Sequence, residues 1–153
     1  MDKLRSKTIT VLILWTLLSL VPTVSADLLV SPEGNVGIGT STPKTKLEVN
    51  GGIAYTFYKH PDLNSGESIN HNGYSFVLIK GNGGSHTTNS TVAVSNGLVP
   101  GHHLIIVCTS SHGVTIKDEA NTKLSGDAVL SDQDSISLIW NGARWIELSR
   151  SNN

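Results

Sequence analysis

The sequence predicts an all-β protein, in which a short N-terminal β-connector precedes a compact β-sandwich or β-wound domain. Three observations support this prediction. Beyond residue 26, no stretch repeats apolar residues at helical spacing over three turns. Short apolar runs recur instead between glycine and asparagine turns, with about eight to twelve residues from one turn to the next. Several of these runs alternate apolar with polar residues, as half-buried strands do.

Residues 1–26 resemble a secretory signal. Lys3, Arg5 and Lys7 give a positive start, residues 9–21 form an apolar run, and Val24-Ser25-Ala26 suits a cleavage site. The apolar run is shorter than the roughly 20 residues that cross a bilayer as a helix. We therefore expect a secreted or cell-surface protein that begins near Asp27 and does not contact the membrane after cleavage. An uncleaved membrane anchor is the alternative.

The composition after residue 26 excludes some classes of partner. Removing the predicted signal takes three of the 11 basic and one of the 12 acidic side chains, which leaves a formal charge of −3. Because no basic cluster remains, we expect no nucleic-acid partner. Cys108 is the only cysteine, so no intramolecular disulfide can form, and we expect it to be a small buried hydrophobic residue.

Residues 27–60 form the predicted connector. Val36 and Ile38 alternate with glycines, and a second alternating run follows at residues 46–50. The turn between the two runs contains Pro43. Gly37 and Gly39 would weaken an isolated strand, so they predict a close approach of another backbone.

The connector sequence resembles the linker motif of phage tail fibres and related bacterial surface proteins. The matching residues, from Gly34 to Gly51, are G-N-V-G-I-G-T-x-x-P-x-x-K-L-E-V-N-G. In those proteins the motif lies before or between trimeric β-domains. The resemblance implies an architecture and no particular chemistry.

Residues 61–153 form the predicted C-terminal β-domain. Loops are expected at residues 81–90 and, in part, at residues 55–73. The run from Leu104 to Cys108 is apolar throughout, which predicts a central strand covered on both faces. The predicted strands are Ser75–Lys80, Thr91–Ser95, Leu104–Thr109, Val114–Lys117, Ala128–Leu130, Ser135–Trp140 and Trp145–Ser149.

The last two strands form a predicted hairpin around Asn141-Gly142, which is a strong turn signal. Whether the loop has two or four residues, Trp145 shares a face with Trp140, Leu138 and Ile136. Ile139, Ile146 and Leu148 occupy the other face, so this hairpin needs covering on both sides.

The closing segment, residues 123–153, resembles the end of C-terminal domains in phage and virus fibre-type proteins. Those domains often finish with a strand, a D-G or N-G turn, and W-x-E-x-S-R-S, which here begins at Trp145. The resemblance implies a fibre-type β-domain.

No motif for catalysis or for a cofactor stands out. Ile38 and Pro43 occupy the glycine positions of a phosphate-binding loop, and no G-x-S-x-G nucleophile elbow occurs. His102 and His103 are adjacent, so a strand would point them to opposite faces and not at one metal ion. We predict no catalytic residues, no cofactor and no metal.

The aromatic residues Trp140, Trp145 and Tyr74 are candidates for one of two roles, as are Tyr55 and Tyr58. They either pack in the core or form a platform on which a sugar stacks.

The sequence therefore favours a secreted, non-enzymatic structural or adhesive protein that forms a homotrimer and contacts a cell-surface glycan or protein. A monomeric secreted carbohydrate-binding module is the alternative, and a small secreted hydrolase is the third hypothesis.

Overall fold

The computed structural model describes residues 28–88 and 93–153, and the predicted signal segment lies outside these ranges. The secondary-structure elements in these ranges are all β-strands, so the predicted all-β class is confirmed. These residues contain no helix long and apolar enough to cross a membrane. The contacts divide the chain into a first unit that ends at Ile53 and a second unit, Ala54–Asn153. The predicted connector continued to residue 60.

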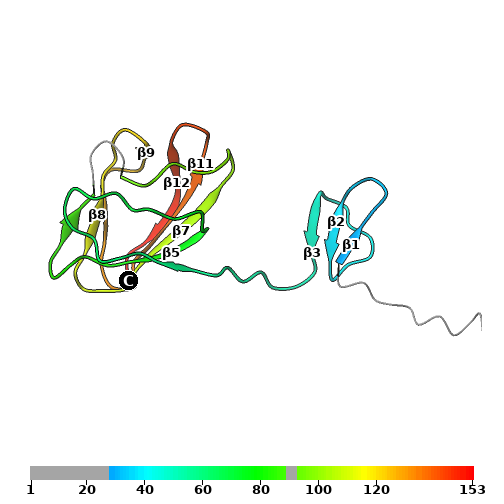
Figure 1. Cartoon of the computed structure of the whole chain (residues 1–153), viewed down its shortest axis with the longest axis horizontal. Coiled ribbons are helices and arrows are strands. Elements are labelled where there is room, and N and C mark those ends of the chain that lie inside the picture. Colours follow the sequence, from blue (N-terminus) through cyan, green and yellow to red (C-terminus); the bar gives the residue numbers. More distant parts are fainter. Residues whose placement is uncertain (1–27, 89–92) are drawn as a thin grey trace, which may run out of the picture. The chain divides into compact units, whose positions relative to one another are not determined.

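The first unit is a three-stranded sheet of β1 (Leu28–Val30), β2 (Val36–Ile38) and β3 (Leu47–Val49). Strand β2 pairs antiparallel with β1 and parallel with β3 (Figure 1). The alternating runs at β2 and β3 predicted these two strands. The alternation did not predict β1, which gives the connector a third strand.

Gly37 and Gly39 are required by the first unit's own backbone. A Cβ atom on Gly37 would lie 2.5 Å from the Thr40 carbonyl oxygen, and one on Gly39 would lie 2.8 Å from the Asn50 carbonyl oxygen. Gly39 also has a φ of +69°, which favours glycine. The predicted close approach of a backbone is therefore present, and it lies within this chain.

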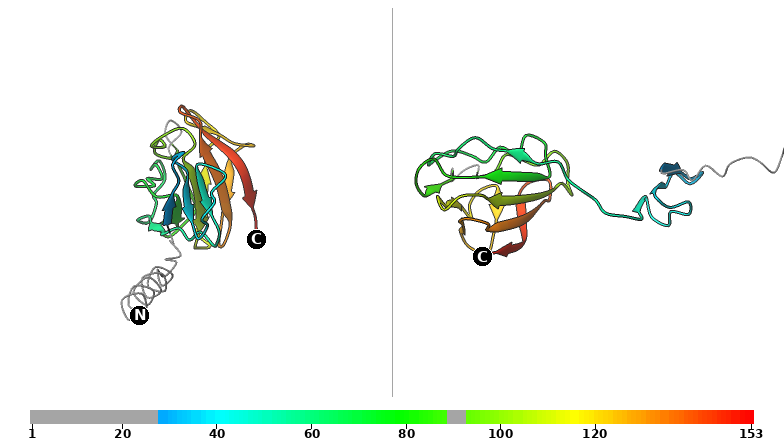
Figure 2. Two further views of the ribbon diagram at one scale, coloured as in Figure 1. Left: turned by 90° about the vertical axis from the view of Figure 1, so that its right-hand side faces the viewer. Right: turned by 90° about the horizontal axis from the view of Figure 1, so that it is seen from below.

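The second unit contains a six-stranded and a three-stranded sheet, which is a β-sandwich arrangement (Figures 1 and 2). The six-stranded sheet has the order β4-β5-β7-β11-β12-β9, and the three-stranded sheet has the order β10-β8-β6. Their bounds are β4 (Tyr58–Lys59), β5 (Phe76–Ile79), β6 (His86–Thr87), β7 (His103–Cys108), β8 (Val114–Ile116), β9 (Thr122–Lys123), β10 (Ala128–Leu130), β11 (Ser135–Trp140) and β12 (Trp145–Ser151).

The core of the second unit consists of the inward-facing residues of both sheets, with a few residues from the connecting segments. Each long strand of the six-stranded sheet contributes alternate residues, as the two-residue period of a strand requires. The fully buried large side chains are Trp145, Leu63, Ile69, Ile79, Leu104, Ile106, Ile116, Leu130, Ile136, Leu138, Val77 and Val94.

Most predicted strands of this unit are present within one or two residues at each end. Three differences concern short segments: β4 lies inside residues 55–73, which were expected to be loop in part, β6 lies inside the predicted loop 81–90, and β9 was not predicted. The predicted strand 91–95 lies partly outside the described residues, and its Val94 makes only an isolated bridge to Ile69. Short strands of two residues carry too little alternation to be recognised from sequence.

Strand β7 is central, as predicted, but only one of its faces is buried. Leu104, Ile106 and Cys108 are fully buried, whereas Ile105 and Val107 are partly exposed. The prediction that both faces are covered is therefore wrong for the single chain, because core residues pack against only one side of the sheet.

The C-terminal hairpin is confirmed, with a four-residue loop. Trp140 pairs with Trp145, and the Asn141 side-chain oxygen accepts hydrogen bonds from the backbone N–H groups of Ala143 and Arg144. The register shifts at a bulge between Ser137 and Leu138.

Candidate functional site

The two tryptophans of the hairpin lie in the core. Trp145 is fully buried and Trp140 is 5% exposed, with their ring centroids 5.4 Å apart. The Trp145 Nε1–H donates to the Ser95 carbonyl oxygen at 2.9 Å. Neither ring therefore offers the exposed face that a sugar needs for stacking.

Two histidines complete this cluster. His71 packs edge-on against His102 at 4.9 Å between ring centroids, and both rings contact Trp145. His71 Nδ1 accepts from the Gly73 N–H, so its Nε2 donates to the Asn96 carbonyl oxygen as a neutral ring. Burial is the main cause that lowers the pKa of His102.

Tyr74, the third predicted aromatic, lies outside the core and is 38% exposed. Its ring stacks on that of Tyr58, with centroids 5.7 Å apart. Tyr74 lines an open hollow of about 340 Å³, which we call the tyrosine pocket. The lining residues of this pocket are Ala54, Tyr55, Thr56, Asn72, Gly73, Tyr74 and Ser75.

A second hollow, of about 430 Å³, lies beside β9 and β12. It is lined by residues 123–125 and by Glu147 and Leu148. The Glu147 carboxylate accepts hydrogen bonds from Arg150 at 2.6 Å and from the Ser125 N–H, and these bonds lower its pKa. The one acidic group of this hollow is thus engaged in a structural ion pair.

The outward side of the six-stranded sheet carries many apolar side chains, and we call it the outer sheet face. Figure 2 shows β5, β7 and β11 side by side in this sheet. The partly exposed side chains of the outer sheet face are Phe76, Leu78, His103, Ile105, Val107, Ser135, Ser137, Ile139 and Ile146. Register places them in rows across the strands, for example Phe76 beside Ile105 and Ile105 beside Ser137.

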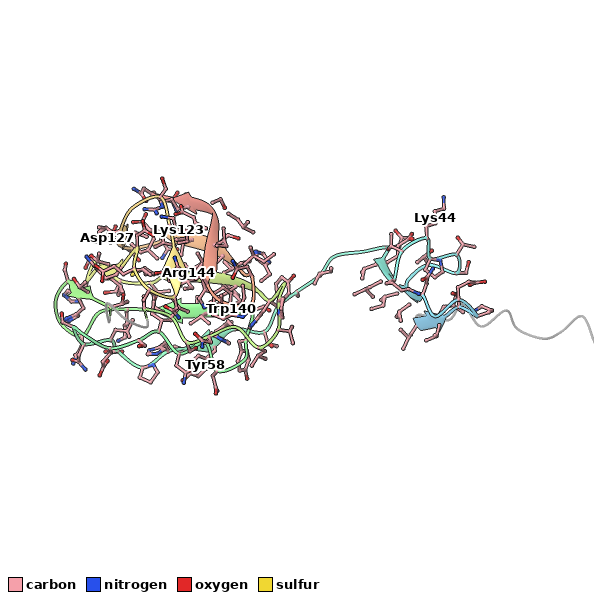
Figure 3. The ribbon with its side chains drawn as sticks, turned by 90° about the horizontal axis from the view of Figure 1, so that it is seen from above. Lys44, Tyr58, Lys123, Asp127, Trp140 and Arg144 are labelled. Atoms are coloured by element: carbon pink, nitrogen blue, oxygen red, sulfur yellow. The ribbon has the colours of Figure 1, made fainter. Side chains whose placement is uncertain are left out.

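Charged side chains border this face at its two edge strands. Lys59 on β4 pairs with Leu78, and Lys123 on β9 pairs with Ile146. Figure 3 shows Lys123 and Tyr58, the neighbour of Lys59, toward opposite sides of the second unit. The interior of the outer sheet face holds one hydrogen-bonded polar pair, His103 Nε2 with Ser137 Oγ at 2.8 Å.

The remaining side chains that could bind a metal or act in catalysis do not form a common site in the described residues. Within residues 28–88 and 93–153, no three His, Cys, Asp or Glu side chains gather as metal ligands would. Cys108 is fully buried, and that burial raises the pKa of its thiol.

A comparison with known protein families identifies the family of this β-sandwich domain. The model of the family described as "Phage depolymerase C-terminal beta sandwich domain" matches residues 64–146, which is more than half of the chain. The chain belongs to this family. Membership supports the fibre-type C-terminal β-domain that the closing segment implied, whereas the match does not extend to the connector motif. No curated protein matches the chain.

Sequence reasoning named Tyr55 and Tyr74 but could not group them around a pocket, and it could not place Tyr58 against Tyr74. The missing element was the turn at Asn72-Gly73, whose dipeptide is itself a strong turn signal. That turn brings residues 72–75 beside residues 54–56.

Proposed function

We propose that this chain is a secreted, non-enzymatic structural module of phage tail-fibre type, which assembles as a homotrimer. Family membership supports the tail-fibre-like structural role. The observation that carries the assembly is the outer sheet face, whose central strands present partly exposed apolar residues.

The composition of the outer sheet face favours contact with further copies of the same face. Removing aliphatic and aromatic side chains from water lowers the free energy of the assembly. No carboxylate lies among its described strand residues, and the lysines lie at its edges, so association need not bury an unpaired charge in its interior. Another copy of this chain offers the required neutral, apolar partner.

The number of copies comes from the resemblance to fibre-type domains in the connector and the closing segment. Three copies around an axis form a closed ring, which covers the outer sheet face of each without leaving a surface for further growth. Gly37 and Gly39 give no additional support, since their close contacts lie within one chain.

The linings of the two hollows described above support the proposal that the module is not an enzyme. The tyrosine pocket is lined by no carboxylate, histidine or cysteine, and Glu147 in the second hollow is paired with Arg150. The hydroxyl groups of the pocket would need an adjacent base to act as nucleophiles, and the pocket lining supplies none.

Light scattering on the exported chain tests the assembly, and intact mass on the same sample tests removal of residues 1–26. We expect a chain that begins at Asp27 and a particle with three times its mass. The variant Ile105→Glu places a charge in the middle of the outer sheet face, so it should give monomers that keep a native β signal by circular dichroism.

The matched control is Val129→Glu, which adds the same charge at a 60% exposed residue of β10 in the other sheet. It should remain a trimer. Phe57→Glu is a second test, because Phe57 is 55% exposed and its ring packs edge-on against Phe76 of the outer sheet face. A folded wild-type monomer would refute the proposal and favour the monomeric carbohydrate-binding module.

A further inference from the structure

The tyrosine pocket combines two partly exposed phenol rings with a lining that carries no charge. Tyr55 is 49% exposed and Tyr74 is 38% exposed. The other lining residues are Asn72, which has an amide, Thr56 and Ser75, which have hydroxyls, and the small residues Ala54 and Gly73. A volume of about 340 Å³ falls within the range of roughly 300–1,000 Å³ that small-molecule sites occupy.

One side of the pocket is a tight turn held in place from several directions. Asn72 and Gly73 have φ values of +50° and +82°, and the Tyr74 N–H donates to the His71 carbonyl oxygen at 2.9 Å. Positive φ at both central residues is the signature of a type I′ turn. Asn72 also donates its N–H to the Asn70 side-chain oxygen.

The turn is joined to the core through His71. This ring accepts from the Gly73 N–H, donates to the Asn96 carbonyl oxygen and packs against Trp145. On the other side of Tyr74, the Ser75 carbonyl oxygen accepts from the Ile105 N–H of the central strand β7. Both ends of the segment that carries Tyr74 are thereby fixed.

One face of the Tyr74 ring packs against another aromatic ring. It stacks on Tyr58, with 26° between the ring planes, and Tyr58 packs against the hydrophobic core. A ligand that contacts Tyr74 therefore meets a ring already in position, and binding need not order it.

We propose that the tyrosine pocket binds a neutral saccharide unit. A sugar ring combines apolar C–H faces, which pack on aromatic rings, with hydroxyl groups that exchange hydrogen bonds with amides and hydroxyls. An anionic or cationic ligand would find no opposite charge in this lining. This inference adds a ligand to the proposed tail-fibre-type module, so it rests on the proposed function for its biological setting.

The test is nuclear magnetic resonance of the exported full chain with neutral saccharides: oligomers of glucose, galactose, mannose, rhamnose, N-acetylglucosamine and N-acetylgalactosamine. We expect at least one to shift the backbone amides of residues 54–56 and 72–75. A sialylated oligosaccharide is the charged comparison and should bind more weakly. Tyr55→Ala and Tyr74→Ala should each weaken binding by about threefold to tenfold, the effect of losing one aromatic contact.

Two variants serve as controls. Tyr74→Phe keeps the ring and its stacking on Tyr58, so it should bind more tightly than Tyr74→Ala. Val129→Ala removes an exposed apolar side chain from β10 and should leave binding unchanged. Tyr55 lies in an exposed segment outside the strands, so Tyr55→Ala keeps the test informative even if Tyr74→Ala unfolds.

The inference is overturned if no saccharide shifts the pocket amides, or if shifts appear elsewhere and survive both alanine variants. Light scattering on the same samples distinguishes a failure of the pocket proposal from a failure of the trimer proposal. A monomer with shifts at the pocket would refute the trimer alone, and a trimer without them would refute the pocket alone.

Discussion

Trp145 is the residue whose truncation should destabilise the second unit most clearly. Its side chain has no exposed surface, and its ring contacts Trp140, His71 and His102 at centroid distances of 5.4–5.7 Å. Its Nε1–H also satisfies the Ser95 carbonyl oxygen. Trp145→Ala would remove all of these contacts and leave a cavity between the hairpin and the His71 turn.

The expected cost is about 3–5 kcal/mol, as for other buried tryptophans. This is a large part of the roughly 5–15 kcal/mol by which a domain is stable. For a domain of about 100 residues, each kcal/mol lowers the melting temperature by roughly 4–8 °C, so the midpoint should fall by about 12 °C or more.

Thermal unfolding followed by far-ultraviolet circular dichroism measures this change. Trp145→Phe keeps an aromatic ring but is smaller and leaves the Ser95 carbonyl without its partner; the lost hydrogen bond alone should cost about 1–3 kcal/mol. Val129→Ala is the control and should stay within about 0.5 kcal/mol of the wild type, because Val129 is 60% exposed. An unchanged melting temperature for Trp145→Ala would refute the placement of this residue in the core.

Three further predictions concern neighbouring parts of the second unit. Gly97→Ala would place a Cβ atom 2.4 Å from the Trp140 ring, so it should cost about 1–3 kcal/mol in chemical denaturation, whereas Gly84→Ala, whose nearest contact is at 4.0 Å, should cost less than about 1 kcal/mol. Burial of Cys108 and its raised pKa predict that a thiol reagent labels the chain only after denaturant unfolds it; rapid labelling of the native protein would contradict this. The lowered pKa of His102 means that the fold favours its neutral form, so this contribution to stability is complete above about pH 6.5 and declines as the pH falls below that value. The melting temperature should therefore be lower near pH 5.5 than near pH 7.5, with a smaller difference in His102→Gln than in the wild type.

The predicted features that the structure bears out depend on short-range patterns. Alternation along β11 and β12, together with Asn141-Gly142, places Trp140 and Trp145 on one face whichever partner strand they meet. Alternation also located β2 and β3, and short apolar runs between turn signals located β5, β7, β8 and β10.

The partners of these strands depend on contacts that are distant in the sequence. β5 pairs with β7 in parallel register, and β9 pairs with β12 in the same way. Two parallel strands must be joined by a long crossover connection, so no local turn signal predicts that they pair.

The sequence alone therefore determined the all-β class, the hairpin and which residues of each long strand share a face, because a strand's two-residue period is a property of the chain itself. The tertiary structure decided which of the two faces is covered. It buried Trp140 and Trp145, and it left Tyr74 exposed beside Tyr55. Burial depends on which distant segment packs against a side chain, and for Tyr74 that was settled when the Asn72-Gly73 turn docked on the core through His71.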